Sequence, residues 1–307
     1  MTPHQLRTFL AVADAGSVSD AAEQLVVTQS AVSASMAGLQ RELGVRLVER
    51  HGRGVRLTEE GVVYAGYARR VLGLLDEALI AARDGQRPER GHVRLAAVPT
   101  AAEQVVPAYL ATFRDRFPEA YVGLDVGSRD EVFHRLVAHE VDLAVAGRPP
   151  PSSALVSQAI APNELVLVAT PDLVLGVRSG AASLARLATM PWLLREPGSG
   201  TRETMLGYLA EHELAPPRLT LGANGAVIAG AAAGLGVTLV SRSAVSRELA
   251  AGELVVVRAP GTPLRRPWHV VTRAEVPAPA RLFLSHLVSD EHHDPATRFV
   301  PGRVRLR

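Results

Sequence analysis

The chain of 307 residues contains no cysteine, and it contains no lysine either. Without cysteine, disulfide bonds, thiolate chemistry and zinc sites with cysteine ligands are all excluded. No stretch approaches the roughly 20 apolar residues that are needed to span a bilayer, so we expect no membrane partner. Residues 1–6 do not form a basic segment followed by an apolar run, so no secretion signal is indicated. These absences favour a cytoplasmic protein.

The sequence also lacks the common catalytic patterns. Its 10 histidines form no His-Glu-x-x-His pair, and no Gly-x-Ser-x-Gly elbow is present. No paired carboxylates and no nucleophile with a neighbouring base stand out. His292, His293 and Asp294 are adjacent near the end of the chain, where a tail is a better interpretation than a metal site. We therefore predict that the chain is not an enzyme, and we expect no cofactor and no metal.

Because lysine is missing, all 33 basic residues are arginines, and 31 acidic residues leave a net charge of only +2. The charge is uneven, however, because residues 41–56 contain five arginines against two glutamates. Arginine stays charged and can hydrogen-bond a phosphate or a guanine through two N–H groups. The last ten residues hold four arginines and no acid, and we interpret them as a solvated, frayed tail.

The length and the composition, 47% hydrophobic and 21% charged, predict a globular protein of two or three folding units. The first part of the chain follows a helical period. Its predicted elements are a first helix that ends at Gly16, helices over 18–25 and 29–43, a β-hairpin over 46–57, and a long helix from Thr58 to about Arg83. Ser17, Thr28 and Thr58 are suitable N-caps, and Gly16 and Gly44 are suitable helix ends.

The second and third predicted helices are short and joined by a tight turn, which is helix-turn-helix geometry. Ala21 and Ala22 allow the helices to cross closely, and Val26 and Val27 are expected to fill the turn. The exposed start of the third helix has short hydroxyls and a glutamine, which suit a helix that enters the major groove. The residues concerned are Thr28, Gln29, Ser30 and Ser33.

The long predicted helix has an apolar residue at every seventh position, namely Leu57, Tyr64, Val71 and Ala78, and these are joined by Ala68, Leu75 and Ala82. A stripe of this length is typical of a helix that pairs with another helix. Packing against its own domain is the alternative, and we favour self-association. Residues 85–91 are polar and contain glycine and proline, which indicates a hinge between domains.

The rest of the chain alternates between predicted strands and helices. Strands are expected over 92–98, 121–126 and 142–146, with helices over 100–117 and 128–138 between them. This order predicts a parallel sheet with helices on both faces. A second set contains strands over 164–170, 191–194, 218–221, 237–240, 254–257 and 268–272 and helices from 201, over 225–234 and over 278–289. Two α/β lobes follow, with a ligand site in the cleft between them.

The N-terminal residues are similar to the pattern of the LysR-type regulators. The similar residues are Leu6, Phe9–Val12, Gly16–Leu25, Thr28–Ser33, Leu39, Leu43–Leu47, Arg50, Leu57, Thr58 and Gly61. The resemblance implies an N-terminal winged helix-turn-helix, a long dimerisation helix and two Rossmann-like lobes that resemble periplasmic solute-binding proteins and bind an inducer. It also implies double-stranded DNA as a partner, a homodimer or homotetramer, and contact with RNA polymerase. Only the last 15 or so residues fall outside the resemblance.

The resemblance also implies roles for single residues. By position, Gln29, Ser30 and Ser33 would face the groove, and Thr28 would contact a phosphate. Arg50 and Arg53 in the wing would reach the minor groove or the backbone. The chain departs from the family pattern at Gln40, Val48 and, above all, at Ala34, where many members have a longer polar residue. These departures concern the identity of the operator and not the way in which DNA is bound.

Two segments of the lobes are candidates for the effector site. Thr100 follows a strand and is expected to cap the next helix, where free N–H groups favour an anion. Residues 195–202 place glycines around a serine just before a helix, with two arginines close by, but no P-loop lysine follows. From this segment we select Ser199, Gly200, Thr201 and Arg202 as binding residues. Asn224 and Arg148 are further candidates, and a small anionic effector fits this set.

The predicted domains are the winged helix-turn-helix over 1–58, the linker helix over 59–87, the effector domain over 88–291 and a flexible tail over 292–307. Lobe one is expected over 92–161 and 267–291, and lobe two over 162–266. The predicted function is effector-controlled regulation of transcription. Alternatives are a DNA-binding architectural protein or repressor without an effector, and an enzyme with an accessory helical domain. A solute-binding transport protein would share the lobes but not residues 1–60.

Overall fold

The computed structural model describes residues 1–307 except for 53, 85–86, 152, 175–181, 290–297 and 303–307. The chain separates into two compact units. Unit 1 contains Met1–Gln86 and Val137–Val141, and unit 2 contains Arg87–Leu136 and Asp142–Arg307. Among the helices within the described ranges, none combines the length and the apolar character that crossing a bilayer requires.

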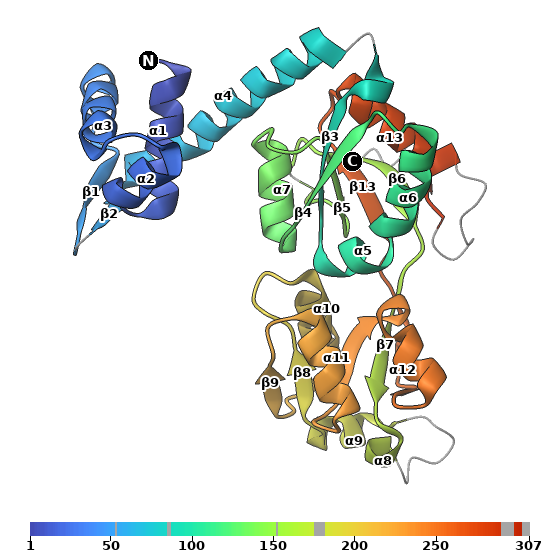
Figure 1. Ribbon diagram of the computed structural model, residues 1–307. Coiled ribbons are helices and arrows are strands. Elements are labelled where there is room, and N and C mark those ends of the chain that lie inside the picture. The colour runs from blue at the N-terminus through green and yellow to red at the C-terminus, as the bar shows by residue number, and fades with distance from the viewer. Residues whose placement is uncertain (53, 85–86, 152, 175–181, 290–297, 303–307) are drawn as a thin grey trace. The chain divides into compact units, whose positions relative to one another are not determined.

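Unit 1 has the predicted order of elements (Figure 1). These are α1 (Pro3–Ala15), α2 (Val18–Leu25), α3 (Gln29–Leu43), β1 (Val48–His51), β2 (Gly54–Leu57) and α4 (Glu59–Asp84). The predicted caps are confirmed, because the side chains of Ser17 and Thr28 accept hydrogen bonds from Asp20 N and Ala31 N. Gly16 and Gly44 end their helices in the left-handed conformation, with φ of 62° and 71°.

The core of unit 1 joins α1, α2, α3 and the first half of α4. Ala21 and Ala22 are buried, so the close crossing of α2 is confirmed. Val26 does not fill the turn, however, because its side chain is 90% exposed. Its backbone is left-handed, with φ 55° and ψ 47°, and this points the side chain into solvent. The expectation for Val26 was therefore wrong.

Lobe one of unit 2 is built on a six-stranded sheet in the order β14-β6-β13-β5-β3-β4. Its strands are β3 (His92–Ala97), β4 (Tyr121–Val126), β5 (Leu143–Ala146), β6 (Val156–Ala161), β13 (Trp268–Thr272) and β14 (Val300–Pro301), and its helices are α5 (Pro99–Gln104), α6 (Val106–Arg116), α7 (Arg129–Val137) and α13 (Ala278–Ser289). The predicted parallel pairing is confirmed for β3 with β4 and with β5. Figure 1 shows α7 on the opposite side of this sheet from α13.

Lobe two is formed by the chain between β6 and β13. Its strands are β7 (Glu164–Ala169), β8 (Trp192–Leu194), β9 (Arg218–Thr220), β10 (Thr238–Ser241), β11 (Val255–Val256) and β12 (Leu264–Arg265), and its helices are α8 (Pro171–Val174), α9 (Leu184–Thr189), α10 (Gly200–Glu211), α11 (Asn224–Ala232) and α12 (Ser246–Ala251). β8 and β9 pair in parallel, whereas β10, β11 and β12 all pair antiparallel with β7. The two lobes have separate hydrophobic cores.

The helix expected over 100–117 is two helices, α5 and α6, which meet at Val105. Pro107 lacks the N–H that a continuous helix would need at this point, so the helix breaks just before it. The cap also differs from the expectation. The N-cap is Val98, Pro99 occupies the first turn, and Thr100 is a buried residue inside α5. The prediction of Thr100 as an N-cap was therefore wrong, because proline at the first helical position starts the helix earlier.

Part of the expected flexible tail is folded. Val300 and Pro301 form β14, which pairs antiparallel with β6 at the edge of the lobe-one sheet. Phe299 is buried, and its backbone N–H donates to the Tyr109 hydroxyl at 3.2 Å. The apolar residues of this stretch therefore anchor it on lobe one. Residues 290–297 and 303–307, which include His292, His293, Asp294 and the last three arginines, lie outside the described residues.

Candidate functional site

The first turn of α3 presents a polar, exposed surface on unit 1. Thr28, Gln29, Ser30 and Ser33 are all exposed, as the sequence suggested. The Thr28 and Ser30 hydroxyls lie 2.9 Å apart, and the Gln29 amide N donates to the Ser19 hydroxyl on α2 at 2.9 Å. The Gln29 amide is therefore held in one orientation by the preceding helix. Its carbonyl oxygen has no hydrogen-bond partner among the described residues, so it can accept a hydrogen bond from outside.

The hairpin of β1 and β2 follows α3 and forms the wing. Val55 N donates to Gly16 O at 2.9 Å, and a Cβ at Gly54 would collide with the same carbonyl oxygen. Glycine at position 54 therefore lets the hairpin approach the turn between α1 and α2. Arg50 is exposed on β1, whereas Arg53 lies outside the described residues. The Arg56 Nε donates to Glu49 at 2.7 Å, whereas Arg50 on β1 has no carboxylate oxygen within 4.0 Å among the described residues.

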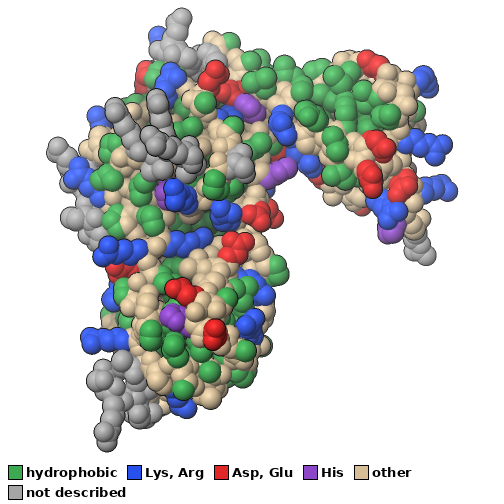
Figure 2. Space-filling view, turned by 180° about the vertical axis from the view of Figure 1, so that it is seen from behind, with side chains coloured by type: hydrophobic (Ala, Val, Ile, Leu, Met, Phe, Trp, Pro, Cys, Tyr) green, Lys and Arg blue, Asp and Glu red, His purple; other side chains and the backbone are tan. Residues whose placement is uncertain are grey.

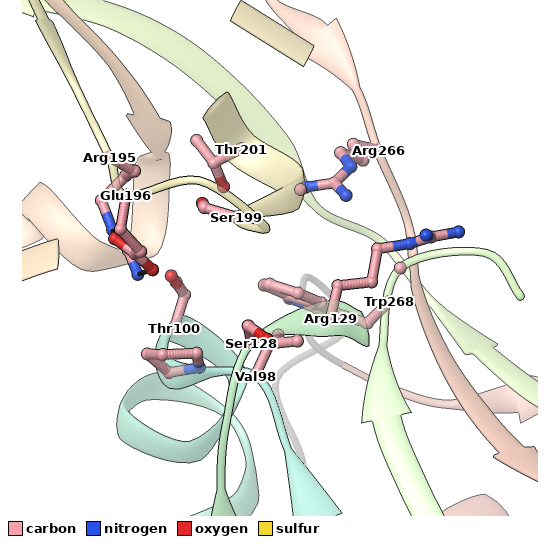
Figure 3. Close-up of a pocket in the computed structure, with 13 residues that line it drawn as sticks. Val98, Thr100, Ser128, Arg129, Arg195, Glu196, Ser199, Thr201, Arg266 and Trp268 are labelled. Carbon is pink, nitrogen blue, oxygen red and sulfur yellow. Dashed lines mark hydrogen bonds and ion pairs between the residues drawn. The ribbon is translucent and has the colours of Figure 1, made fainter. Parts of the chain in front are cut away.

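A cleft separates the two lobes of unit 2, and residues of both lobes line it (Figure 3). Thr100 and Ser128 come from lobe one, and Ser199, Gly200 and Thr201 come from the start of α10 in lobe two. Ser199 is the N-cap of α10 and accepts from Arg202 N, so the N-terminal end of α10, where backbone N–H groups lack partners within the helix, lies at the cleft. The enclosed space is only about 30 Å³, which is room for about one water molecule.

Charged side chains lie at both ends of this cleft. Figure 3 shows Arg195 and Glu196 near Thr100, and Arg129 and Arg266 at the other end. Arg195 is buried and forms an ion pair with Glu196 at 2.8 Å. Burial alone would raise the pKa of Glu196, but the hydrogen bonds from Arg195 and the charges of Arg195 and Arg202 lower this pKa below its usual value. Glu196 is therefore a stable anion that neutralises Arg195.

A hydrogen-bond chain links the two lobes beside the cleft. Arg195 Nη1 donates to Asn224 Oδ1 at 3.2 Å, and Asn224 Nδ2 donates to Glu103 on α5 at 3.2 Å. Asn224 is therefore buried as a bridge between lobes and is not among the residues that line the cleft. Arg202 donates to Arg195 O at 2.7 Å and to Thr220 Oγ1 at 3.2 Å, so it fixes the loop before α10.

Four of the seven candidate effector residues come together at the cleft, namely Thr100, Ser199, Gly200 and Thr201. Arg202 and Asn224 lie behind them, and exposed Arg148 lies at a neighbouring hollow. Ser128, Arg129 and Arg266 also line the cleft and were not predicted from the sequence. Ser128 and Arg129 follow β4 as Thr100 follows β3, so the rule that ligands lie at the carboxyl ends of parallel strands could have found them. Arg195 belonged to the segment considered but was not selected.

Arg266 is placed by the two chain crossings between the lobes. Its backbone N–H donates to Asn163 O, and its carbonyl oxygen accepts from Asn163 Nδ2, both at 2.9 Å. No feature of the sequence before β13 indicated this pair, because the pairing depends on the order of the strands. Among the described residues, no group of three or more His, Asp or Glu is arranged to hold a metal ion.

Two family models match the chain. Residues 3–62 match the bacterial regulatory helix-turn-helix protein model of the lysR family, and residues 86–290 match the LysR substrate binding domain model. Among curated relatives, the HTH-type transcriptional activator CmpR of Synechocystis is 32% identical over 298 residues, which is 96% of each chain.

Two solved structures are also similar. CbnR in complex with its target DNA is 27% identical with a TM-score of 0.65, over 93% of this chain and 98% of that one. The regulatory domain of Synechocystis CcmR in complex with 2-PG is 29% identical with a TM-score of 0.59, over 64% of this chain and 94% of that one. The exposed first turn of α3, the wing, the two lobes and these matches lead to one conclusion: the chain belongs to the LysR family of DNA-binding transcription regulators, whose members are not enzymes.

Proposed function

We propose that the cleft of unit 2 binds a small anionic effector and that the start of α3, together with the wing, binds operator DNA. One observation carries the effector half of this proposal. The cleft brings the hydroxyls of Thr100, Ser199 and Thr201 to the N-terminus of α10, with the guanidinium groups of Arg129 and Arg266 at one end and the Arg195–Glu196 ion pair at the other. Free helix N–H groups and hydroxyls are the usual ligands of carboxylate and phosphate groups. The CcmR domain, which contains 2-PG, is a relative of this unit and supports the same class of ligand.

The small volume of the cleft has a consequence for the mechanism. Because only about 30 Å³ is enclosed, a ligand of metabolite size can enter only if side chains or lobes move apart. Binding would then stabilise a different lobe arrangement from the one described. A ligand shifts such an equilibrium by its difference in affinity for the two states, typically about 1–3 kcal/mol. This is the link that we propose between effector and transcription.

The DNA half rests on the exposed residues of unit 1. Ser33 and the Gln29 side chain are exposed where base edges would lie, and Arg50 and Thr28, whose hydroxyl also caps α3, are exposed where phosphates would lie. We propose that a homodimer, or a homotetramer built from dimers, places several such helices on one operator and contacts RNA polymerase there. Operator DNA is part of the chromosome, so we propose that the protein acts in the cytoplasm.

The DNA contacts are tested by mapping the genomic sites bound by the full-length protein and measuring affinity for one of them. Arg50→Ala is expected to weaken binding about tenfold, and Ser33→Ala somewhat less, because each removes one contact to DNA. Arg247→Gln is the matched control, because Arg247 is exposed on α12 in lobe two. Unchanged affinity in both unit 1 variants would refute this interface.

The effector site is tested by adding candidate anions to the complex with DNA. The first probe is 2-PG, followed by inorganic phosphate, sulfate and dicarboxylates. The active anion is expected to change DNA affinity by about 5–150-fold. Thr100→Val should abolish this response and leave binding in its absence intact. If no anion changes the affinity by more than twofold, the alternative of a DNA-binding protein without an effector is the better description.

A further inference from the structure

A second hollow of about 560 Å³ lies beside the cleft, and arginines dominate its lining. Four arginines contribute, namely Arg129, Arg148, Arg265 and Arg266, and Glu203 is the only acidic residue in the lining. The lining therefore has an excess of three positive charges. Figure 2 shows several basic side chains gathered where the two lobes of unit 2 meet. Like charges that face one hollow repel one another unless an anion lies between them.

The arginines of this hollow have few partners of their own. Within the described part of the chain, the side chains of Arg148, Arg265 and Arg266 donate no hydrogen bond and have no carboxylate oxygen within 4.0 Å. Arg129 does have partners, because its Nη2 donates to Arg148 O at 3.0 Å and its Nη1 lies 3.6 Å from Asp130. These contacts orient the Arg129 side chain, and Glu203 is the acidic residue of the lining that acts on Arg266, so the lining keeps an excess of positive charge.

Two glycines leave the space that the Arg266 guanidinium occupies. A Cβ at Gly200 would collide with the Arg266 guanidinium, and a Cβ at Gly147 would lie 3.1 Å from Nη2. Burial lowers the pKa of Arg266, and the nearby charge of Arg129 lowers it further, whereas Glu203 raises it. A cation in this situation is stabilised by any anion that reaches it. Arg129 and Arg266 thus present guanidinium groups both to the cleft and to the hollow.

His269 adds a buried polar group to the same hollow. It lies on β13 next to Ala146 of β5 and Ile160 of β6, and its Nδ1 lies 2.8 Å from the Ser157 hydroxyl. Arg148 is the charged group that acts on it, and burial is the larger cause of its lowered pKa of about 4. The ring is therefore neutral at pH 7. The neutral ring adds nothing to the repulsion, and in the tautomer that accepts from Ser157 at Nδ1 it has an Nε2–H that can donate to an anion.

From this geometry we infer that the hollow is a second anion site, for a ligand with several negative charges such as a compound with two linked phosphoryl groups. A single carboxylate would leave most of the excess charge uncompensated. Guanidinium groups bind phosphoryl oxygens through paired N–H donors, and four of them can surround a diphosphate. The volume of the hollow far exceeds that of one water molecule, about 30 Å³ in the liquid. The site does not depend on the effector proposed for the cleft.

The test uses full-length protein, inorganic pyrophosphate as the probe and titration calorimetry at constant ionic strength. Wild type is expected to bind pyrophosphate, and the double variant Arg148→Gln/Arg265→Gln is expected to bind it at least tenfold more weakly. These two arginines line the hollow but not the cleft. Arg218→Gln is the control, because Arg218 is exposed on β9 and lines neither space. It should bind within twofold of wild type.

A cleft variant separates this site from the effector site. Thr100→Val should leave pyrophosphate binding unchanged, since Thr100 lines only the cleft. The proposal is overturned if wild type binds no pyrophosphate, if the double variant binds it as well as wild type, or if Thr100→Val abolishes binding. It is also overturned if acetate competes as strongly as pyrophosphate, because that would indicate general screening. If the proposal for the cleft were wrong, DNA affinity would instead stay unchanged when candidate anions are added.

A second readout follows His269 directly by NMR of labelled histidines, with His269→Gln for assignment. A bound anion should raise the pKa of His269, because a nearby negative charge favours the imidazolium. Addition of pyrophosphate is therefore expected to shift the titration of this ring to higher pH in wild type and not in the double variant. An unchanged titration in the presence of bound pyrophosphate would place the ligand elsewhere.

Discussion

At the scale of single residues, Val26 stands out because a valine side chain fits poorly with its left-handed backbone conformation. A β-branched residue in the left-handed region costs roughly 1–2 kcal/mol, and the exposed side chain gains little from packing. Val26→Asn should stabilise the turn by up to about 1 kcal/mol, because asparagine tolerates this conformation. Slower hydrogen exchange of the α2 and α3 amides in Val26→Asn than in wild type would show this stabilisation.

The matched control is Val27→Asn. Val27 is also exposed, at 40%, but is not among the residues with a positive φ. It should therefore gain nothing from asparagine. If the two variants protect the α2 and α3 amides from exchange equally, the stabilisation does not come from replacing a valine in the left-handed conformation.

His269 makes stability depend on pH. Its folded-state pKa of about 4 lies below the value of 6.5 for a free histidine, chiefly through burial and also through Arg148. Unfolding therefore takes up a proton between these values, and stability is full above pH 6.5, falls with falling pH and levels off below pH 4. The loss from this one group is on the order of 3 kcal/mol. Denaturant unfolding at several pH values measures it.

In His269→Gln the stability of unit 2 should depend less on pH in this window. His134→Gln is the control, because it removes an exposed histidine on α7 of the same lobe. If the slope of stability against pH is the same in wild type and His269→Gln, burial of a neutral ring is not its origin.

The sequence predicted those site residues whose chemistry is local. Ser199 precedes a helix in a glycine-rich turn, and Thr28 precedes another, so neighbours along the chain were sufficient to select them. Arg266 and Ser128 could not be selected in that way. Arg266 reaches the cleft only because Asn163, 103 residues earlier, pairs with it. Thr100 was selected for an incorrect reason, since it lies in the cleft without capping α5.

At the scale of elements, N-cap residues and terminal glycines predicted the helix bounds of unit 1 well. The bounds of α2 agree with the prediction because Ser17 and the turn after Leu25 define both ends locally. Short strands in unit 2 were missed, including β6, β12 and β14. β12 and β14 have only two residues each, too few for an alternating pattern to be seen. They are strands because β7 and β6 offer unpaired edges in space.

The apolar stripe of α4 packs within its own unit over the first half of the helix, and self-association through the second half stays a prediction. Ala65 and Ala68 are buried in unit 1, whereas Val71, Leu75 and Leu79 are 41%, 40% and 52% exposed. The first half of the helix therefore packs in its own unit, and the second half presents an apolar surface. Hydrophobic side chains also cover a continuous area of unit 1 in Figure 2. Such a surface is typical of an interface with a second copy.

If α4 mediates self-association, Leu75→Glu should dissociate the protein. A charge introduced into an apolar helix pair should weaken the assembly at least tenfold, and sedimentation velocity would show the smaller species. Glu60→Gln, at an exposed position in the first turn of the same helix, should not change the assembly. A Leu75→Glu protein that sediments like wild type would point to an interface elsewhere.

The last strand is expected to contribute to the stability of lobe one. Phe299 is 1% exposed and lies against Tyr109, with ring centroids 5.4 Å apart. Phe299→Ala should lower the free energy of unfolding by about 3–5 kcal/mol, the usual cost of removing a buried phenylalanine. Val300→Ala is the control, because Val300 is 52% exposed in the same strand. Equal stability of the two variants would show that Phe299 does not anchor the segment.

At the scale of the whole molecule, two units with separate cores should unfold separately. Calorimetry of wild type is expected to show more than one transition. Operator DNA should stabilise only the transition of unit 1, and a bound anion only that of unit 2, each by about 2.7 kcal/mol at 100 times its Kd. A single cooperative transition, shifted equally by both ligands, would contradict this division.

The order of strands in lobe one also bears on how the protein is made. Lobe two is one continuous stretch between β6 and β13, so all its strands have been synthesised before β13 leaves the ribosome. Lobe one, in contrast, receives its inner strand β13 only after lobe two, and its edge strand β14 later still. A nascent chain that has been synthesised through β13 but not through β14 would therefore hold a complete second lobe beside an incomplete first one, with the edge of β6 open to pairing with other nascent chains.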